Sequence, residues 1–295
     1  MESPLFTQAT TIFTQVRAEC GIGSNPISTA LQDTAMLRQL HDVNSDAVNY
    51  AYRLGLLGWK FLRRETTIIT IANTTINGAL TSGTTSITLT SGTSWDDPAA
   101  GSASTDIAAG YVKTADNIFD FFTYTDISGT SVTGVEGISR SHATLEEAHK
   151  VYQLPTDFGK MRALFRESRT YLYEYLDEDK AQVPPFGFYM VKSLINGTKR
   201  RSFLVFPEDI GALDWSVYYM KRPTTIDEVT DYIDMPDGNG RRYIVEKMKE
   251  YVWSVLGEEN DAALSRQRAE KHIQDLASEW SVATLQPNRS LYFAF

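Results

Sequence analysis

Cysteine is almost absent from this chain of 295 residues, in which Cys20 is the only one. A single thiol cannot form a disulfide within the chain, and it excludes metal sites built from several cysteines. Long apolar runs are also missing, because no segment approaches the roughly 18 apolar residues of a membrane-spanning helix. The first residues lack the basic segment and apolar core of a secretory signal. We therefore expect no signal peptide and no membrane association.

Motifs that carry chemistry are equally scarce. There is no glycine-rich phosphate loop ending in Gly-Lys-Ser/Thr, and no Gly-x-Ser-x-Gly turn. The nearest approach to a metal motif is His142, Glu146, Glu147 and His149, which does not have the zinc-protease spacing of two histidines four residues apart. Cys20 is interpreted as a buried, inert thiol. The sequence therefore predicts no metal, no cofactor and no enzymatic activity.

Basic residues are outnumbered, with 28 lysines and arginines against 37 aspartates and glutamates, a net charge of -9. An acidic chain repels phosphates, so we expect no general binding of nucleic acid. The one short basic run, Lys199–Arg201, is interpreted as a solvated turn. Hydrophobic residues make up 42% of the chain, which is enough for a sizeable folded core.

The first part of the chain, to about Glu65, has the pattern of helices. Apolar residues recur at helical spacing from Ile27 to Leu40. The cap-type residues Asn44–Asp46 predict the start of a second helix that carries Trp59. The two helices would form an antiparallel hairpin. One longer bent helix is the alternative, because no glycine or proline marks the break.

The composition changes abruptly at Thr66. From there to Arg140 roughly a third of the residues are Ser or Thr, and β-branched residues favour strands. Ser86–Thr90 alternates as a one-sided strand, and a turn at Ser128–Gly129 predicts a hairpin. Glycines punctuate the segment, which indicates a small all-β domain. The alternative of a disordered linker is disfavoured because Ile, Val, Phe and Tyr recur between the turns.

From about Ser141 the pattern is mixed. Pro236–Gly240 is a strong turn signal that separates expected strands from two closing helices with apolar core stripes. The second stripe includes Leu264, Ile273 and Leu276. The expected elements are a short helix from Ser141 or Thr144 to Lys150, strands at Phe186–Val191, Ser202–Phe206 and Trp215–Tyr219, and helices ending at Gly257 and Trp280.

These patterns predict an α+β protein with a predominantly helical core interrupted by an all-β, sandwich-like insertion domain. The expected boundaries place the first part of the core in residues 1–65, the inserted β domain in 66–140, the second part of the core in 141–280 and a tail in 281–295. The tail ends in Leu291, Tyr292, Phe293, Ala294 and Phe295. An exposed aromatic terminus favours aggregation, so we expect it to be buried on its own domain, a neighbouring subunit or a partner.

Three stretches resemble the head–tail adaptor (connector) proteins of tailed bacteriophages. The first is the N-terminal helical pair that ends in Trp59–Glu65 (WKFLRRE). The others are Tyr152–Phe158 (YQLPTDF) and Trp215–Pro223 (WSVYYMKRP), the last followed by Ile233–Pro236 and two closing helices. The parts of the chain to which they belong, 1–65 and 141–280, make up roughly two thirds of it. The segments Thr84–Thr90, Gly110–Val112 and Ser128–Val135 are similar to small β modules of phage tail and fibre proteins, which compact adaptors lack.

The resemblance implies a structural virion protein at the head–tail junction, assembled in the host cytoplasm. Such proteins form a homo-oligomeric ring, a dodecamer, beneath the portal protein. Genomic DNA passes through the central channel without sequence-specific contact. The other implied partners are tail or nozzle proteins, with tail fibres as a further candidate. An acidic lining that does not grip phosphates would let the DNA slide.

Two sets of residues are candidates for binding partners. A cyclic ring needs two different surfaces on each subunit, and the charged side chains of the last helix are the candidate for one of them: Arg266, Arg268, Glu270 and Lys271. Aromatic residues dominate buried interfaces, so the candidate portal anchor is the tail: Leu291, Tyr292, Phe293 and Phe295.

Two other functions are weighed against the ring. One is a tail-completion or fibre- or spike-attachment protein, in which the β domain would be the docking platform. The other is a glycan hydrolase that uses two carboxylates, such as Glu146 and Glu147. Any sequence with many acidic residues offers such pairs, so their presence alone does not indicate an enzyme. The enzyme hypothesis has little support in the sequence.

Overall fold

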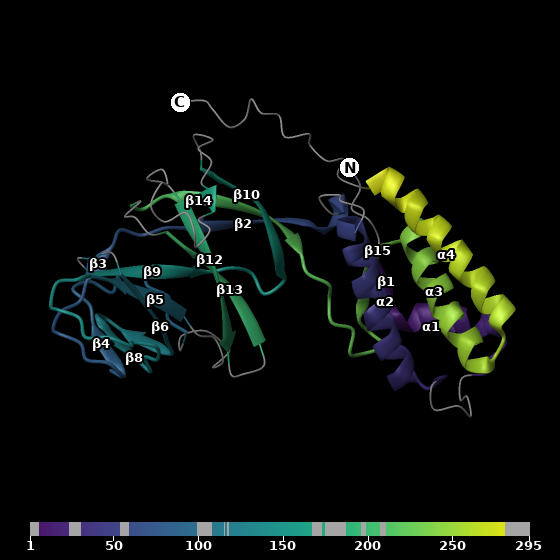
Figure 1. The fold of residues 1–295 in the computed structure, drawn as a ribbon, viewed down its shortest axis with the longest axis horizontal. Coiled ribbons are helices and arrows are strands. Elements are labelled where there is room, and N and C mark those ends of the chain that lie inside the picture. The colour runs from purple at the N-terminus through teal and green to yellow at the C-terminus, as the bar shows by residue number, and fades with distance from the viewer. Residues whose placement is uncertain are drawn as a thin grey trace. The chain divides into compact units, whose positions relative to one another are not determined.

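A computed structural model describes most of the protein. The described residues are 6–23, 31–53, 59–98, 108–114, 116, 118–166, 173–174, 187–195, 199–206 and 211–280. The chain divides into two compact units. The first combines Met1–Arg64 with Tyr219–Phe295, and the second is the intervening Glu65–Tyr218. Helices α1–α4 all belong to the first unit, which we call the helical unit, and the second is the β unit (Figure 1).

The helical unit is assembled from both ends of the chain. Helices α1 (Ala9–Cys20) and α2 (Asp33–Arg53) come from the first part, and α3 (Asn239–Leu256) and α4 (Glu259–Trp280) from the last. A short strand β1 (Phe6–Gln8) pairs antiparallel with β15 (Tyr232–Pro236). A 3-10 turn, η2 (Lys60–Leu62), precedes the exit to the β unit. The two ends of the sequence therefore share one fold.

One hydrophobic core fills this unit and draws on every helix. Its fully buried side chains include Ile12, Met36, Leu40, Trp59, Met220, Ile233, Met248 and Ile273. Trp59 lies outside α2, and its Nε1 donates to the Ala47 carbonyl at 2.9 Å. All members of this core lie within the helical unit. The unit therefore does not draw on the β unit for its core.

Helices α3 and α4 form an antiparallel pair joined by a short turn. Helix α3 ends where Gly257 adopts φ +81, and the amide of Glu258 donates to the Trp253 carbonyl at 2.9 Å. Helix α4 starts two residues later and packs against α3, which also contacts α1 and α2 (Figure 1). The predicted end of α3 at Gly257 is confirmed.

Helix α2 runs without a break through the segment where the sequence predicts a new helix cap. Asn44 is fully buried within it and bonds to Asp234 instead of capping a helix. The expectation of two helices joined near 41–45 was wrong, and the alternative of one long helix holds for Asp33–Arg53. Cap-type residues do not break a helix when their side chains have partners elsewhere in the fold.

The described residues of the β unit form three sheets. The largest has the order β11-β12-β13-β9-β5-β6, with β3 also paired to β9; the others are β10-β14-β2 and β4-β8-β7. The strands are β2 (Arg63–Ile69), β3 (Thr74–Thr75), β4 (Ser86–Thr88), β5 (Ala108–Lys113), β6 (Phe119–Tyr124), β7 (Asp126–Ser128), β8 (Ser131–Thr133), β9 (Glu147–Gln153), β10 (Phe158–Arg166), β11 (Tyr173–Glu174), β12 (Gly187–Ile195), β13 (Lys199–Val205) and β14 (Asp214–Lys221).

Several predicted strands are confirmed. Strands β7 and β8 form the expected hairpin, with Ser128 opposite Ser131 and Gly129 at φ +61, the conformation that a two-residue turn of this kind requires. Strands β12 and β13 pair antiparallel from Tyr189–Val205 to Ile195–Lys199. The predicted strand at Trp215 is β14.

The predicted predominantly helical core was wrong. Fifteen strands and four α-helices lie in the described part of the chain, and strands β9 to β14 extend the β unit to Tyr218. The predicted helix ending at Lys150 is wrong: its last four residues, 147–150, belong to strand β9, which pairs with β5 on one edge and with β3 and β13 on the other. Residues 147–153 have ordinary helix formers, but burial of Ala148, Val151 and Tyr152 in the sheet overrides that local preference.

Aromatic rings pack closely in the core of the β unit. Trp95 stacks on Phe122 with ring centroids 6.4 Å apart, and Gly110 of β5 lies directly beneath them. A Cβ atom at Gly110 would lie 2.6 Å from Phe122 Cζ and 2.9 Å from Trp95 Cζ3. The core therefore has no room for even one methyl group at this position.

We expect Gly110→Ala to lower the free energy of unfolding of the β unit by about 1–3 kcal/mol, because overpacking forces rings off their rotamers. Chemical denaturation followed by tryptophan fluorescence measures the change. Gly23→Ala is the control, since nothing lies within 4 Å of a Cβ there. Equal stability of the two variants would show that the rings do not enclose Gly110 this closely.

Candidate functional site

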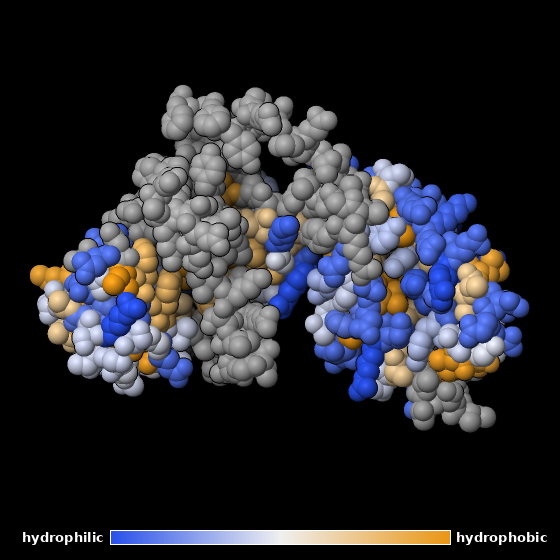
Figure 2. Space-filling model, in the orientation of Figure 1, coloured by the Kyte–Doolittle hydropathy of each residue, from blue (hydrophilic) through white to orange (hydrophobic). Residues whose placement is uncertain are grey.

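The outer face of α4 is the candidate surface that the sequence predicts in the helical unit. Every third or fourth residue of α4 is buried against the unit: Ala262, Ser265, Ala269, Ile273 and Leu276. The opposite side carries charges of both signs, and Figure 2 shows a largely hydrophilic surface along this helix. A helix that buries such a narrow stripe leaves most of its circumference available to a partner.

The structure places all four predicted ring-interface residues on this exposed side. Arg266 Nε donates to Glu250 Oε1 of α3 at 2.6 Å, so this residue is engaged within its own subunit. Arg268, Glu270 and Lys271 are exposed, and their side chains form no hydrogen bond or ion pair with another residue in the described part of the chain. Three of the four residues are therefore available to another subunit, and their role there stays a prediction.

Apolar side chains lie exposed where α3 meets α4. Leu264 is 43% exposed, although the sequence predicted it in the core stripe, and Val255 and Leu256 are also exposed at the end of α3. The prediction for Leu264 was wrong because α4 meets α3 along the small residues Ala262, Ser265 and Ala269 instead. The turn between the helices thus combines apolar and charged side chains, a mixture that is typical of interface surfaces.

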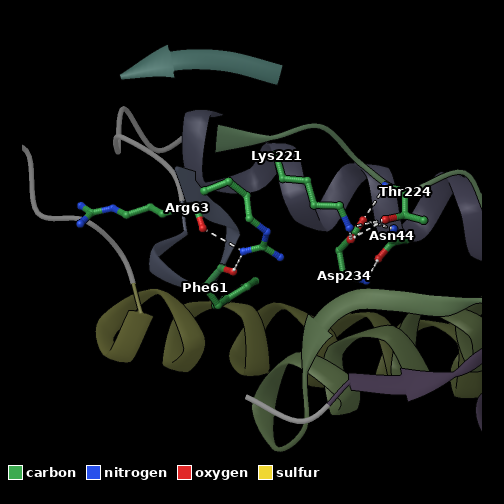
Figure 3. Close-up of polar contacts among 7 residues, drawn as sticks. Asn44, Phe61, Arg63, Lys221, Thr224 and Asp234 are labelled. Carbon is green, nitrogen blue, oxygen red and sulfur yellow. Dashed lines mark hydrogen bonds and ion pairs between the residues drawn. The ribbon is translucent and has the colours of Figure 1, made fainter. Parts of the chain in front are cut away.

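A buried polar network lies where the chain returns to the helical unit (Figure 3). Asp234 of β15 accepts hydrogen bonds from Lys221 Nζ at 2.8 Å, from the Thr224 amide at 2.6 Å and from Asn44 Nδ2 at 2.9 Å. In return, the Asp234 amide donates to Asn44 Oδ1 at 2.8 Å. The network joins α2, the end of β14 and β15.

The electrostatics of this network favour the ionised carboxylate. Burial alone raises the pKa of Asp234, but the hydrogen bonds from Lys221 and Thr224 and the charge of Lys221 outweigh it, so the pKa lies below its ordinary value. Every oxygen of the carboxylate has a donor, and nothing points to a reacting group. The sequence did not predict this network, whose members are up to 190 residues apart.

The nearest approach to a chemical site is a second buried cluster, in the β unit. His142 Nδ1 lies 2.7 Å from Glu146 Oε2, and its Nε2 lies 3.0 Å from Asp120 Oδ2. His149 is separate, since its Nε2 lies 3.1 Å from Glu147 Oε2 and its ring stacks on Tyr111. The four residues singled out in the sequence therefore do not form one site.

Asp120 is held in place by donors on several sides. Burial raises its pKa, but hydrogen bonds from His142, from the Ser139 side chain and from the Ser139 and Arg140 amides lower it below the ordinary value overall. Both ring nitrogens of His142 are engaged and its side chain is fully buried. In the described part of the chain no group of histidine, cysteine and acidic residues could hold a metal ion. The cluster fastens residues 139–146 to β6.

Cys20 lies at the end of α1 and is buried. Burial raises the pKa of its thiol to about 11, so the reactive thiolate is rare at neutral pH. We expect the native protein to react with a thiol reagent such as DTNB much more slowly than the protein unfolded in guanidinium. Absorbance of the released thiolate at pH 7 measures both rates. Similar rates in the two states would contradict the buried, unreactive thiol.

The remaining sequence predictions concern the tail and the membrane. The proposed portal anchor, Leu291, Tyr292, Phe293 and Phe295, lies outside the described residues. None of the helices within the described ranges is both long and apolar enough to span a bilayer.

Comparisons with known proteins do not identify a family. No model of a known protein family matches the chain, and no curated protein matches its sequence.

Proposed function

We propose that this protein is a structural subunit of a tailed bacteriophage particle, a head–tail adaptor that forms a ring between the portal and the tail. The proposal starts from the three adaptor-like stretches of the sequence, Trp59–Glu65, Tyr152–Phe158 and Trp215–Pro223. The first and third of these stretches contain the points at which the chain leaves and re-enters the helical unit. There β2 and β14 pair as neighbouring strands.

The observation that carries the proposal is the outer face of α4. A ring with cyclic symmetry uses two different surfaces per subunit, each covered by the next copy. Arg268, Glu270 and Lys271 provide an exposed, mixed-charge surface on a rigid helix, which suits a contact in which orientation matters. The overall charge of -9 fits a channel through which DNA slides without being held.

The solution mass of the purified protein tests this proposal. Light scattering is measured for the protein alone and after addition of portal rings from the same phage. An adaptor forms a ring by itself or joins the portal ring as one copy per portal subunit. A protein that stays monomeric under both conditions is not an adaptor.

The size of the β unit favours a second candidate function, a platform for fibres or spikes. This unit spans Glu65–Tyr218, well beyond the predicted insertion of 66–140. Replacing residues 66–217 with a short Gly-Ser linker discriminates between the candidates. We expect the helical unit to fold in this variant, because its core lies entirely outside the deleted segment. Particles with joined tails but no fibres would show that the β unit is a platform on an adaptor. Particles that have both joined tails and attached fibres would exclude the platform role.

A further inference from the structure

A groove of about 610 Å³ lies along strand β2 in the β unit. Its volume is within the range of cavities that hold ligands. One wall consists of four consecutive residues of β2, Thr66–Ile69, and the other of Tyr152–Thr156, at the end of β9 and just beyond it. Asp96 and Lys150 complete the lining.

The lining shows that the groove follows the edge of β2 and not one of its faces. Successive side chains of a strand point to opposite faces, so a cavity on one face would contact alternate residues. Contact with Thr66, Thr67, Ile68 and Ile69 in succession places the cavity beside the backbone. Strand β2 is the last strand in the order β10-β14-β2, so among the described residues no strand pairs with this edge.

Both walls are fixed in place, so the groove is preformed. The amide of Ile71, just after β2, donates to the Tyr152 hydroxyl at 2.8 Å and ties the two walls together. Lys150 Nζ bonds to Asp96 Oδ1 at 2.7 Å and lies 5.4 Å from the centre of the Tyr152 ring. A binding site that needs no rearrangement loses less affinity to ordering.

The charged residues of β2, Arg63–Glu65, lie outside the groove lining, and the four residues of β2 that line the groove carry neither charge nor proline. Edge strands are normally protected by charged residues, proline or a covering segment. In β2, Thr67 and Ile69 are exposed on the same face, and Ile69 is 63% exposed. An edge that no described strand covers, with β-branched side chains, favours the addition of an extended segment as a further strand.

We propose that this edge binds the C-terminal segment of a second copy of the protein, residues 291–295, as an added strand. The inference rests on the proposed ring, in which the segment and the groove are the two different surfaces of one head-to-tail contact. The segment reads Leu-Tyr-Phe-Ala-Phe, rich in residues that favour strands. Five residues of a strand span about 17 Å, which is enough to pair with all four β2 residues of the groove and to extend past them by about one residue.

A linker of ten residues, 281–290, separates Trp280 at the end of α4 from Leu291. Fully extended, they span up to about 33–36 Å. The added strand would also shield two features that favour aggregation when exposed, an edge strand without a described neighbour and the aromatic segment 291–295.

Binding of a labelled peptide tests the proposal directly. The peptide is residues 286–295, the protein is the chain truncated after Leu285, and fluorescence anisotropy reports binding. We expect saturable binding that Ile69→Lys weakens by about tenfold or more, because a charge at the edge opposes pairing. Leu145→Lys is the matched control, with a leucine 68% exposed elsewhere in the β unit, and a scrambled peptide controls for composition.

The assembly of the full-length chain gives the second measurement. Ile69→Lys and an excess of free peptide are each expected to lower the mass of the assembly, while Leu145→Lys leaves it unchanged. Rings of unchanged mass from Ile69→Lys or from the truncated chain would overturn this inference and leave the adaptor proposal standing. Peptide binding to a chain that remains monomeric at full length would overturn both the second-copy contact and the ring.

Discussion

Asp234→Ala is expected to lower the free energy of unfolding of the helical unit by about 3–5 kcal/mol, the range for removing one partner of a buried ion pair. The variant leaves Asn44 Nδ2 and the Thr224 amide without their acceptor and removes the carboxylate that pairs with Lys221, in a site where the Asp234 side chain is only 3% exposed. Guanidinium denaturation followed by circular dichroism at 222 nm measures the loss. The control is Asp42→Ala, an exposed aspartate of α2 in the same unit, for which a change within about 0.5 kcal/mol is expected.

The same network makes stability depend on pH in a definite direction. The pKa of Asp234 is lowered in the folded protein, so its contribution is present above about pH 4, the ordinary value for aspartate. The contribution disappears as the pH falls through the folded pKa, because the protonated carboxyl binds Lys221 poorly. The stability difference between the wild type and Asp234→Asn should therefore shrink from pH 7 to pH 3. A difference that stays constant would contradict an ionised, paired Asp234.

The double variant Arg268→Glu and Lys271→Glu is expected to prevent ring assembly. The two exposed side chains form no ion pair in their own subunit within the described residues, so reversing them leaves the fold intact. In a ring, the introduced glutamates would repel the acidic groups of the neighbouring copy that face Arg268 and Lys271. Contacts between like charges cost several kcal/mol at an interface. We expect the particle mass, measured by light scattering, to fall from that of a ring to that of a monomer.

The matched control for this variant is Arg38→Glu with Lys60→Glu. It makes the same change in net charge at two exposed positions of the same unit, outside α4. If both double variants lose the ring, the effect comes from overall charge and not from the α4 face. If neither does, the α4 face is not part of the ring interface. Melting curves confirm that each variant is folded.

Local patterns in the sequence were enough to predict the closing helices and several strands. Gly257 ends α3 because only a residue that tolerates positive φ fits there, and the turn at Gly129 fixes the β7–β8 hairpin for the same reason. These signals lie within a few residues of the elements that they determine. They survive in the fold because no distant contact opposes them.

Features that depend on distant partners could not be predicted in this way. Residues 147–153 form a strand only because β5, β3 and β13 provide edges to pair with. Asp120 and His142 are 22 residues apart, and Asn44 and Asp234 are 190 apart. No spacing rule connects such pairs. The fold class was therefore misjudged where sheet pairing outweighs local helix preference.

One projection image of the purified assembly tests the proposed ring most directly. We predict a rotationally symmetric ring with a central opening wide enough for duplex DNA, with twelve copies expected from the adaptor resemblance. Single copies, or compact particles without a central opening, would contradict it.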